Sequence, residues 1–224
     1  TKEGAIAGPK VLEHIVDTVL TIEGDRTSNI RMIKTQKNRF GSIENIGLFE
    51  MSDSGLIEIH DPHALFVGEK SKQDEPGSAI SAIVEGSRVL LVEVQALVIS
   101  SQLPVPRRVC RGISVPKLQL ISAILQKHCN LSIGNADIFV NVVGGLRIED
   151  PAGDLAIAMA IASSALSKPL RNDRAYAGEI GLLGEVRKVS RAEFRVKEVK
   201  KQGYADLITR ETAPRLKQLV SKMS

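Results

Sequence analysis

Two basic residues stand two positions apart at the end of a strand-like segment that begins near Ile30. On a β-strand, residues i and i+2 project from the same face, so Lys37 and Arg39 would present two positive charges together while Asn38 points away. A pair of cations held in this way suits a phosphate group. The alternative is an ordinary hairpin end whose charged side chains are solvated.

The same segment resembles a motif of a bacterial family. The DNA repair family RadA, also called Sms, has the motif Lys-Asn-Arg-Phe-Gly. The same five residues stand here in the same order as Lys37, Asn38, Arg39, Phe40 and Gly41. The run from Thr1 to Val19, with Gly-Ala-Ile-Ala-Gly-Pro at 4–9, is similar to the segment before that motif, and the resemblance spans essentially all 224 residues. It implies a RecA-like ATPase in hexameric rings that remodels recombination intermediates and drives branch migration on DNA, with other recombination proteins as partners.

The resemblance implies a role for the two basic residues in ATP hydrolysis. Lys37 and Arg39 are expected to reach the γ-phosphate of ATP bound by a neighbouring subunit and to stabilise the charge that develops during phosphoryl transfer. The sequence contains no Gly-Lys pair, which a phosphate-binding loop requires, and the family's Cys-rich zinc finger is missing. We therefore expect this chain alone to bind no cofactor, with ATP, Mg and zinc belonging to the whole protein.

Lys2 offers a further contact with DNA. The segment from Lys2 to Gly8 resembles a DNA-facing loop of RecA-type proteins, in which glycine allows a close approach of the backbone and the lysine neutralises phosphate. The alternative is a surface loop without a binding role.

A second segment, from Glu149 to Ala160, resembles the nucleophile segment of Lon-type proteases. In those proteins a serine opens an apolar helix and lies near its positive end. The resemblance places Gly153 at the serine position and, through Gly-Glu-Val at 184–186, Glu193 at the position of the lysine base. Glycine has no nucleophilic atom, so we expect a Lon-type domain without the catalytic dyad and without peptidase activity.

Two alternatives concern these residues. Glu193 completes a Ser-x-x-Glu pattern with Ser190, which is typical of a helix-capping box. An active peptidase with a displaced nucleophile would need Ser163 or Ser164, but both lie at the far end of the apolar helix, where packing or bonds to the backbone are expected. A purely structural oligomerisation domain is the third hypothesis.

Basic side chains of the second domain provide candidate contacts with DNA phosphates. They lie in a Pro-flanked loop, across a strand–helix junction and on the following helix: Arg107, Arg108, Arg111, Arg187, Lys188, Arg191, Arg195, Lys197, Lys200 and Lys201. On that helix the predicted buried face is Ala192, Val196 and Val199, which leaves the cations in solvent. The alternative is a solvated face with routine ion pairs. Aromatic residues make up only 3% of the chain, so platforms for base stacking are not indicated.

Composition narrows the class of protein. The net charge is +4, and residues 171–224 hold 13 Lys or Arg against 7 Asp or Glu, so the positive excess is C-terminal.

Cys110 and Cys129 form no Cys-x-x-Cys motif, and His60-Asp61-Pro62-His63 is typical of a turn, so no metal site is predicted. A cytoplasmic protein fits this cysteine usage. No apolar run approaches the roughly 20 residues that span a bilayer, so no membrane partner is expected, and the start indicates a fragment of something longer.

The predicted elements divide the chain into two domains. Strands are expected at 18–23, 30–35, 46–51 and 56–59 after a short helix between 9 and 17, and a polar linker at 67–78 follows. Beyond it, strands at 79–84, 89–98, 138–143 and within 175–189 alternate with helices at 115–128, 155–166, 190–202 and 213–221. The fold class is therefore α/β, with α+β character in the second domain.

The combined hypothesis assigns residues 1–66 to the C-terminal portion of a RecA-like ATPase core and residues 79–224 to a Lon-protease-like domain. That domain would bind DNA and act as a scaffold for a hexameric ring.

Overall fold

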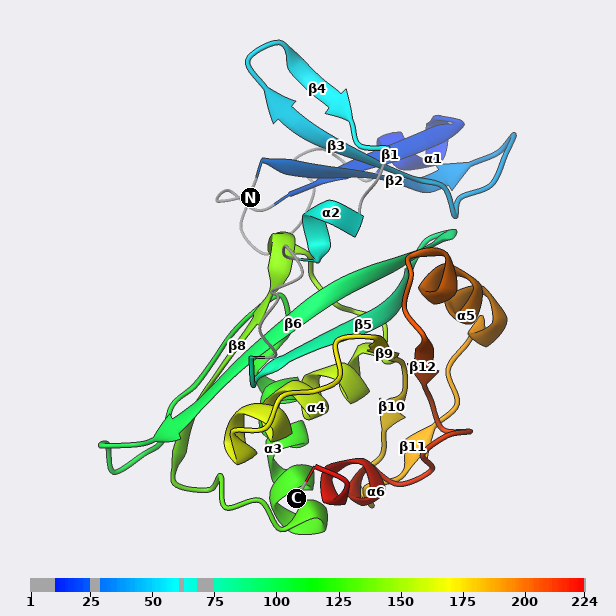
Figure 1. The fold of residues 1–224 in the computed structure, drawn as a ribbon. Coiled ribbons are helices and arrows are strands. Elements are labelled where there is room, and N and C mark those ends of the chain that lie inside the picture. The colour runs from blue at the N-terminus through cyan, green and yellow to red at the C-terminus, as the bar shows by residue number, and fades with distance from the viewer. Residues whose placement is uncertain (1–10, 25–28, 61–62, 68–74, 224) are drawn as a thin grey trace. The chain divides into compact units, whose positions relative to one another are not determined.

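The structure is a computed structural model that describes residues 11–24, 29–60, 63–67 and 75–223 (Figure 1). Two compact units are present. The first contains residues up to His60 together with 86–88, and the second contains 61–85 and 89–224. Lys2 and residues 68–74 of the predicted linker lie outside the described residues.

The first unit is a four-stranded antiparallel meander preceded by a short helix. Its elements are α1 (Val11–Ile15), β1 (Thr18–Glu23), β2 (Ile30–Asn38), β3 (Ile46–Ser52) and β4 (Gly55–Glu58). The predicted strands are confirmed to within a few residues. Between β3 and β4 the Ser52 hydroxyl donates to the carbonyl of Gly55, which has a φ of +113°, so glycine is favoured at this turn.

Few side chains of the first unit are fully covered. Met32 pairs with Leu48 across β2 and β3, and both are buried together with Ile46. Leu20 and Ile22 on β1 are 59% and 61% exposed. The described residues of this unit therefore leave much of its apolar surface uncovered.

The second unit is built on a six-stranded mixed sheet in the order β12-β9-β5-β6-β8-β7. Its strands are β5 (Ser78–Glu85), β6 (Arg88–Ser100), β7 (Arg108–Arg111), β8 (Ala136–Val142), β9 (Arg174–Tyr176) and β12 (Asp206–Ile208), and β10 (Glu179–Ile180) pairs separately with β11 (Val186–Arg187). β9 is parallel to both β12 and β5, β7 is parallel to β8, and β6 is antiparallel to β8. The predicted mixed α/β architecture is confirmed for this unit.

Helices cover the sheet in layers. They are α2 (His63–Phe66), α3 (Val115–Cys129), α4 (Gly153–Leu166), α5 (Ala192–Lys201) and α6 (Leu216–Ser221). α4 packs against β5 and also contacts α3 and α6, so it lies between the sheet and an outer helical layer (Figure 1). Every residue of α4 from Leu155 to Ser163 is buried, which explains why this helix is apolar on all sides.

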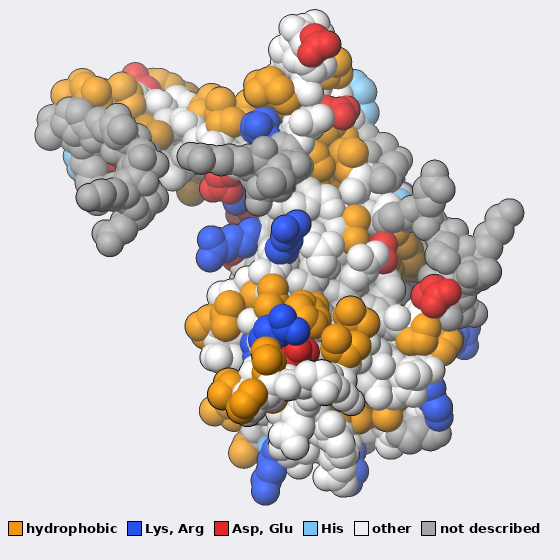
Figure 2. Space-filling model, turned by 90° about the vertical axis from the view of Figure 1, so that its left-hand side faces the viewer, with side chains coloured by type: hydrophobic (Ala, Val, Ile, Leu, Met, Phe, Trp, Pro, Cys, Tyr) orange, Lys and Arg blue, Asp and Glu red, His pale blue; other side chains and the backbone are white. Residues whose placement is uncertain are grey.

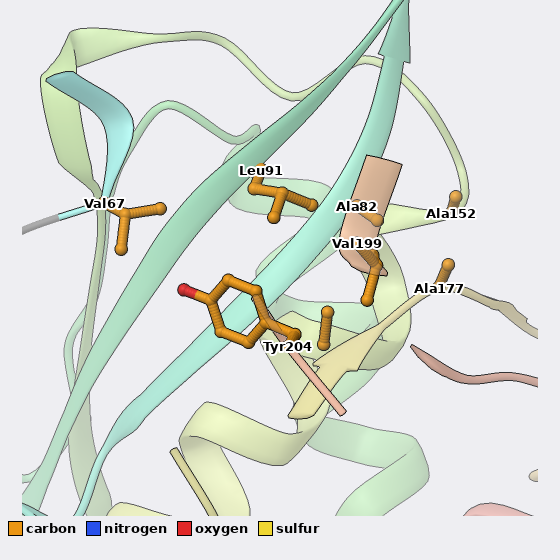
Figure 3. Close-up of a cluster of buried hydrophobic side chains, with 8 residues drawn as sticks. Val67, Ala82, Leu91, Ala152, Ala177, Val199 and Tyr204 are labelled. Atoms are coloured by element: carbon orange, nitrogen blue, oxygen red, sulfur yellow. The ribbon is translucent and has the colours of Figure 1, made fainter. Parts of the chain in front are cut away.

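β5 is covered on both faces. Ala82 and Ile83 are adjacent, so their side chains point to opposite faces of the sheet, yet each is fully buried. Ala82 belongs to a cluster with Val199 of α5 and Tyr204 (Figure 3). Val67, the first residue of the predicted linker, packs in the same cluster.

Three short elements were missed by the sequence analysis. α2, β7 and β12 are only three or four residues long, too short to show a clear hydrophobic period. The prediction that Arg108 and Arg111 lie in a loop is wrong, because residues 108–111 form β7 in parallel register with Ile138–Asn141 of β8. Prolines 104 and 106 and two arginines obscured the strand signal.

Candidate functional site

Lys37 and Arg39 both turn toward the segment that precedes β1. Lys37 lies in β2 and its Nζ donates to the carbonyl of Glu13 at 2.7 Å. Arg39 follows the strand, and its guanidinium lies 3.3 Å from the Asp17 carboxylate with both side chains more than half exposed. The two cations therefore share one side of the hairpin, as the alternation of a strand predicts.

The remaining residues of this motif shape the strand end. The side-chain oxygen of Asn38 accepts from the amide of Phe40 at 3.1 Å, and a Cβ added to Gly41 would lie 2.9 Å from the Asn38 amide nitrogen. The Phe40 ring is 84% exposed. An exposed ion pair such as Arg39–Asp17 contributes only about 0–1 kcal/mol, so it would yield readily to a phosphate.

Gly153 occupies a closed position in the first turn of α4. It is buried, and an added Cβ would lie 2.5 Å from Cγ2 of Ile148. The next residue, Asp154, forms a 2.8 Å ion pair with Lys117 of α3. Burial raises the pKa of the Asp154 carboxyl despite the opposing effect of the Lys117 ammonium. A structural ion pair thus stands beside the position where the resemblance places a serine.

Glu193 is exposed in the first turn of α5, but the predicted capping box is wrong. The N-cap residue is Arg191, which has a left-handed conformation (φ 54°, ψ 37°), and no side chain caps the helix. Ser190 instead uses its carbonyl to accept from Nε of Arg195. The helix therefore begins one residue later than the box requires.

The serines that would supply a displaced nucleophile are bound to the backbone. The Ser163 hydroxyl is buried, accepts from the amide of Gly77 at 2.9 Å and donates to the carbonyl of Lys168 at 2.6 Å. The Ser164 hydroxyl accepts from the amide of Val98 at 2.9 Å. Both hydroxyls fix α4 to neighbouring segments, as the expected packing role requires.

Arg195 is not a solvent-facing cation, and this part of the DNA-contact prediction is wrong. Its side chain is fully buried, forms a 2.8 Å ion pair with Asp150 and donates to the carbonyl of Ala82. The predicted buried face of α5 is also wrong in part, since Val199 is buried but Ala192 and Val196 are exposed. The helix is rotated so that Arg195 and Val199 face the sheet.

Most of the other predicted DNA contacts are engaged locally. Arg107 pairs with Asp137 at 2.8 Å, and Arg108 donates to the carbonyls of Ala136 and Ile133. The remaining acidic contacts are those of Arg187 with Glu179 and Glu185, of Lys188 with Glu211, and of Lys201 with Glu198. On the face in Figure 2, basic side chains form separate small groups rather than one continuous patch.

Arg111 and Lys200 are exposed and make no ion pair with any other described residue. They remain available for a ligand, whereas Arg191 is half-buried at the start of α5.

A pocket of about 410 Å³ in the second unit contains basic residues that the sequence analysis missed. Its lining consists of His128, Leu183, Gly184, Arg215, Lys217, Gln218 and Ser221. A helix was predicted at 213–221, which includes Arg215 and Lys217, and the C-terminal excess of positive charge was the signal in the sequence that pointed to them.

Neither metal ligands nor a membrane segment were found in the part of the chain that the structure describes. No group of three or more His, Cys, Asp or Glu residues there could hold a metal ion. Residues 61 and 62, which belong to the turn predicted at His60–His63, are outside the described ranges. Within those ranges, no helix combines the length and apolarity needed to cross a bilayer.

Comparison with known proteins gives similarities at two levels. A family model described as subunit ChlI of Mg-chelatase matches residues 116–212, which lie within the second unit. Curated proteins named DNA repair protein RadA match most of the chain. That of Rickettsia bellii is 47% identical over 208 residues, which is 93% of this chain and 46% of the relative.

Two further relatives agree. The RadA proteins of Brucella abortus and Aquifex aeolicus are each 48% identical over 204 residues, 91% of this chain. These matches cover 44% and 46% of the two relatives, so the chain spans about half the length of the curated proteins it matches. Over that span, the chain belongs to the bacterial RadA family of DNA repair proteins.

Proposed function

We propose that this chain is part of a DNA repair ATPase that remodels recombination intermediates and promotes branch migration. Residues 1–66 would be the C-terminal portion of its RecA-like core, and residues 79–224 a Lon-type domain that binds DNA and holds a ring together. The observation that carries the proposal is the match of more than nine-tenths of the chain to proteins named DNA repair protein RadA.

The first unit supports the assignment to an ATPase core through its two cations. Lys37 and Arg39 lie on one side of the hairpin, and the Arg39 side chain forms an exposed ion pair with Asp17. This arrangement suits a contact with ATP of a neighbouring subunit. The residues present do not fit a complete nucleotide site, because the chain has no Gly-Lys pair, and with two separate cysteines they do not fit a zinc finger. ATP, Mg and zinc therefore belong to the whole protein in this proposal.

The second unit supports a binding role rather than peptide hydrolysis. Gly153 lacks a nucleophile and faces Ile148, and Glu193 replaces the expected lysine. The hydroxyls of Ser163 and Ser164 are engaged by the backbone. The surface of the domain is therefore where we expect its function. Its exposed cations without an ion pair to another described residue, Arg111 and Lys200, suit a phosphate group.

The proposal is tested by measuring DNA affinity and molecular mass of the chain together. We expect affinity for a short duplex and a single strand to fall steeply between 50 and 200 mM salt, on the order of tenfold or more, because counterions are released on binding. We also expect a mass of several subunits. A monomer that does not bind DNA at low salt would contradict the proposal, and a ring without DNA affinity would favour the structural oligomerisation domain.

A further inference from the structure

The pocket beside α6 brings together three segments of the second unit. His128 comes from the last turn of α3, Leu183 and Gly184 from the loop between β10 and β11, and Arg215, Lys217, Gln218 and Ser221 from the start and body of α6. α3 also packs directly against α6 (Figure 1). The volume of about 410 Å³ is large enough for a phosphate group with its sugar.

The rim of this pocket is held in place by side chains of the pocket itself. Nη1 of Arg215 donates to the carbonyl of Leu183 at 3.1 Å, and Nε2 of His128 lies 2.9 Å from the carbonyl of Leu182. Gly184 has a φ of +75° and packs so closely on His128 that an added Cβ would lie 3.0 Å from the histidine Cβ. The loop is therefore positioned before any ligand binds.

The charge of the pocket distinguishes it from other basic sites of the chain. Its lining includes Arg215, Lys217 and His128 but no carboxylate. Glu185 directly follows Gly184 in the sequence. Its carboxylate accepts hydrogen bonds from the Arg187 guanidinium and from the amide of Leu183. Arg107, Arg187 and Arg195, in contrast, each have an acidic partner within 3.3 Å.

The Lys217 ammonium acts electrostatically on the thiol of Cys129. Burial raises the pKa of this thiol to about 11, while the ammonium acts in the opposite direction. No ion pair of Arg215 or Lys217 occurs among residues 11–24, 29–60, 63–67 and 75–223. Neither cation of the pocket is therefore paired with a carboxylate within the described chain.

We propose that this pocket binds a backbone phosphate of nucleic acid, with Arg215 and Lys217 as the charged contacts and Gln218 and Ser221 as polar ones. The inference rests on the proposed function and adds a site that lies outside the predicted DNA-contact residues. A concave site with two cations and no carboxylate is complementary to a phosphodiester, and a preformed rim reduces the entropy that binding costs. Contacts of this kind are independent of base sequence.

The first test uses inorganic phosphate as the probe on the isotope-labelled chain. We expect phosphate to shift the NMR signals of the His128 ring and of the Leu183 and Gly184 amides, and the double variant Arg215→Glu, Lys217→Glu to abolish those shifts. Unchanged signals in the wild-type chain at high phosphate would overturn the proposed site, whatever the chain does with DNA.

The second test measures affinity for a DNA duplex as a function of salt. The double variant Arg215→Glu, Lys217→Glu should lose at least about tenfold in affinity at 100 mM salt, and the slope of log affinity against log salt should fall by about one to two. The matched control is Lys127→Glu, Arg210→Glu, which makes the same change in net charge with exposed residues outside the pocket. We expect it to lose much less.

The outcomes separate the inference from the proposed function. Wild-type DNA binding with equal losses in both double variants would overturn the pocket as a specific contact and leave the proposed function intact. Shifts with inorganic phosphate but no DNA binding by the wild-type chain would contradict both the proposed function and the nucleic-acid ligand. Circular dichroism and thermal unfolding verify folding, and the milder variant Lys217→Gln should give an intermediate loss.

Discussion

The buried guanidinium of Arg195 on α5 lies 2.8 Å from the carboxylate of Asp150, which stands ahead of α4. The same carboxylate accepts from the amides of Val84 and Ala152, at 2.7 and 3.0 Å. Arg195 in turn donates to the carbonyl of Ala82. One ion pair therefore joins β5, the start of α4 and α5.

Removing Arg195 should strongly destabilise the second unit. Arg195→Ala leaves the Asp150 carboxylate without its cation, and breaking a buried pair typically costs about 3–5 kcal/mol. Lys197→Ala changes an exposed cation on the same helix and should stay within about 0.5 kcal/mol. Denaturant unfolding measures both changes. Equal stability of the two variants would refute the structural role of this pair.

The double variant Arg195→Met, Asp150→Asn separates the effect of charge from that of packing. It removes both charges while the asparagine oxygen can still accept a backbone hydrogen bond, so it should recover part of the loss seen in Arg195→Ala. A double variant less stable than Arg195→Ala would contradict this account.

Arg195 also shows where prediction from sequence reaches its limit. The helix at 190–202 was predicted correctly in its position, but a polar residue type was taken to indicate an exposed face. Arg195 can be buried because it pairs with the carboxylate of Asp150, which lies much earlier in the chain. The local hydrophobic periodicity of the helix does not indicate such a distant partner. The apolar helix α4 was predictable because burial on every side leaves a composition signal.

The candidate binding residues also differ in whether the sequence predicts their arrangement. The strand end that holds Lys37 and Arg39 followed from alternation, which is a local property. The pocket around Arg215 combines residues from α3, α6 and the β10–β11 loop, so only the tertiary structure brings them together.

Asp137 should make stability depend on acid pH. Hydrogen bonds from the Arg107 amide and the Ser101 side chain lower the pKa of this carboxyl to about 2, from an unfolded value of about 3.9. A lowered pKa stabilises the folded state above the unfolded value, and this contribution is lost as the pH falls from about 4 to 2. The difference in stability between wild type and Asp137→Asn should therefore be constant near neutral pH and shrink below pH 4.

The control for this prediction is Asp206→Asn, which alters a half-exposed ion pair with Arg174 of 3.6 Å. Its effect should be small throughout the pH range. Unfolding followed by fluorescence of a bound dye or by circular dichroism, at pH 2 to 7, provides the measurement. A difference for Asp137→Asn that did not shrink in acid would show that the carboxylate is not the source of the stability.

Restoring a serine at position 153 should not restore peptidase activity. In Gly153→Ser the new Cβ would meet Cγ2 of buried Ile148, so we expect a loss of about 1–3 kcal/mol. Gly153→Ala is the steric control and should lose a similar amount. Even when Ile148→Ala relieves the contact, Glu193 cannot act as the lysine base that a Lon-type dyad requires, and casein should stay intact. Cleavage by Gly153→Ser, Ile148→Ala but not by Gly153→Ala, Ile148→Ala would show that the site retains catalytic geometry.

Lys37 and Arg39 should affect ATP turnover in a full-length RadA-family protein without affecting ATP binding by the same subunit. Replacing Lys37 by alanine removes one hydrogen bond to the Glu13 carbonyl, and replacing Arg39 removes an exposed ion pair, so each should cost only about 1 kcal/mol of stability. A cation that stabilises the transition state of phosphoryl transfer contributes about 10³-fold or more to turnover. The double variant Lys37→Ala, Arg39→Ala should therefore lower kcat by orders of magnitude with little change in KM.

The matched control is Lys34→Ala, which removes a basic residue of the same strand. Lys34 pairs with Glu23, and this variant should keep normal turnover. Normal kcat in the double variant, with rings intact, would exclude a role for this pair at the neighbouring nucleotide.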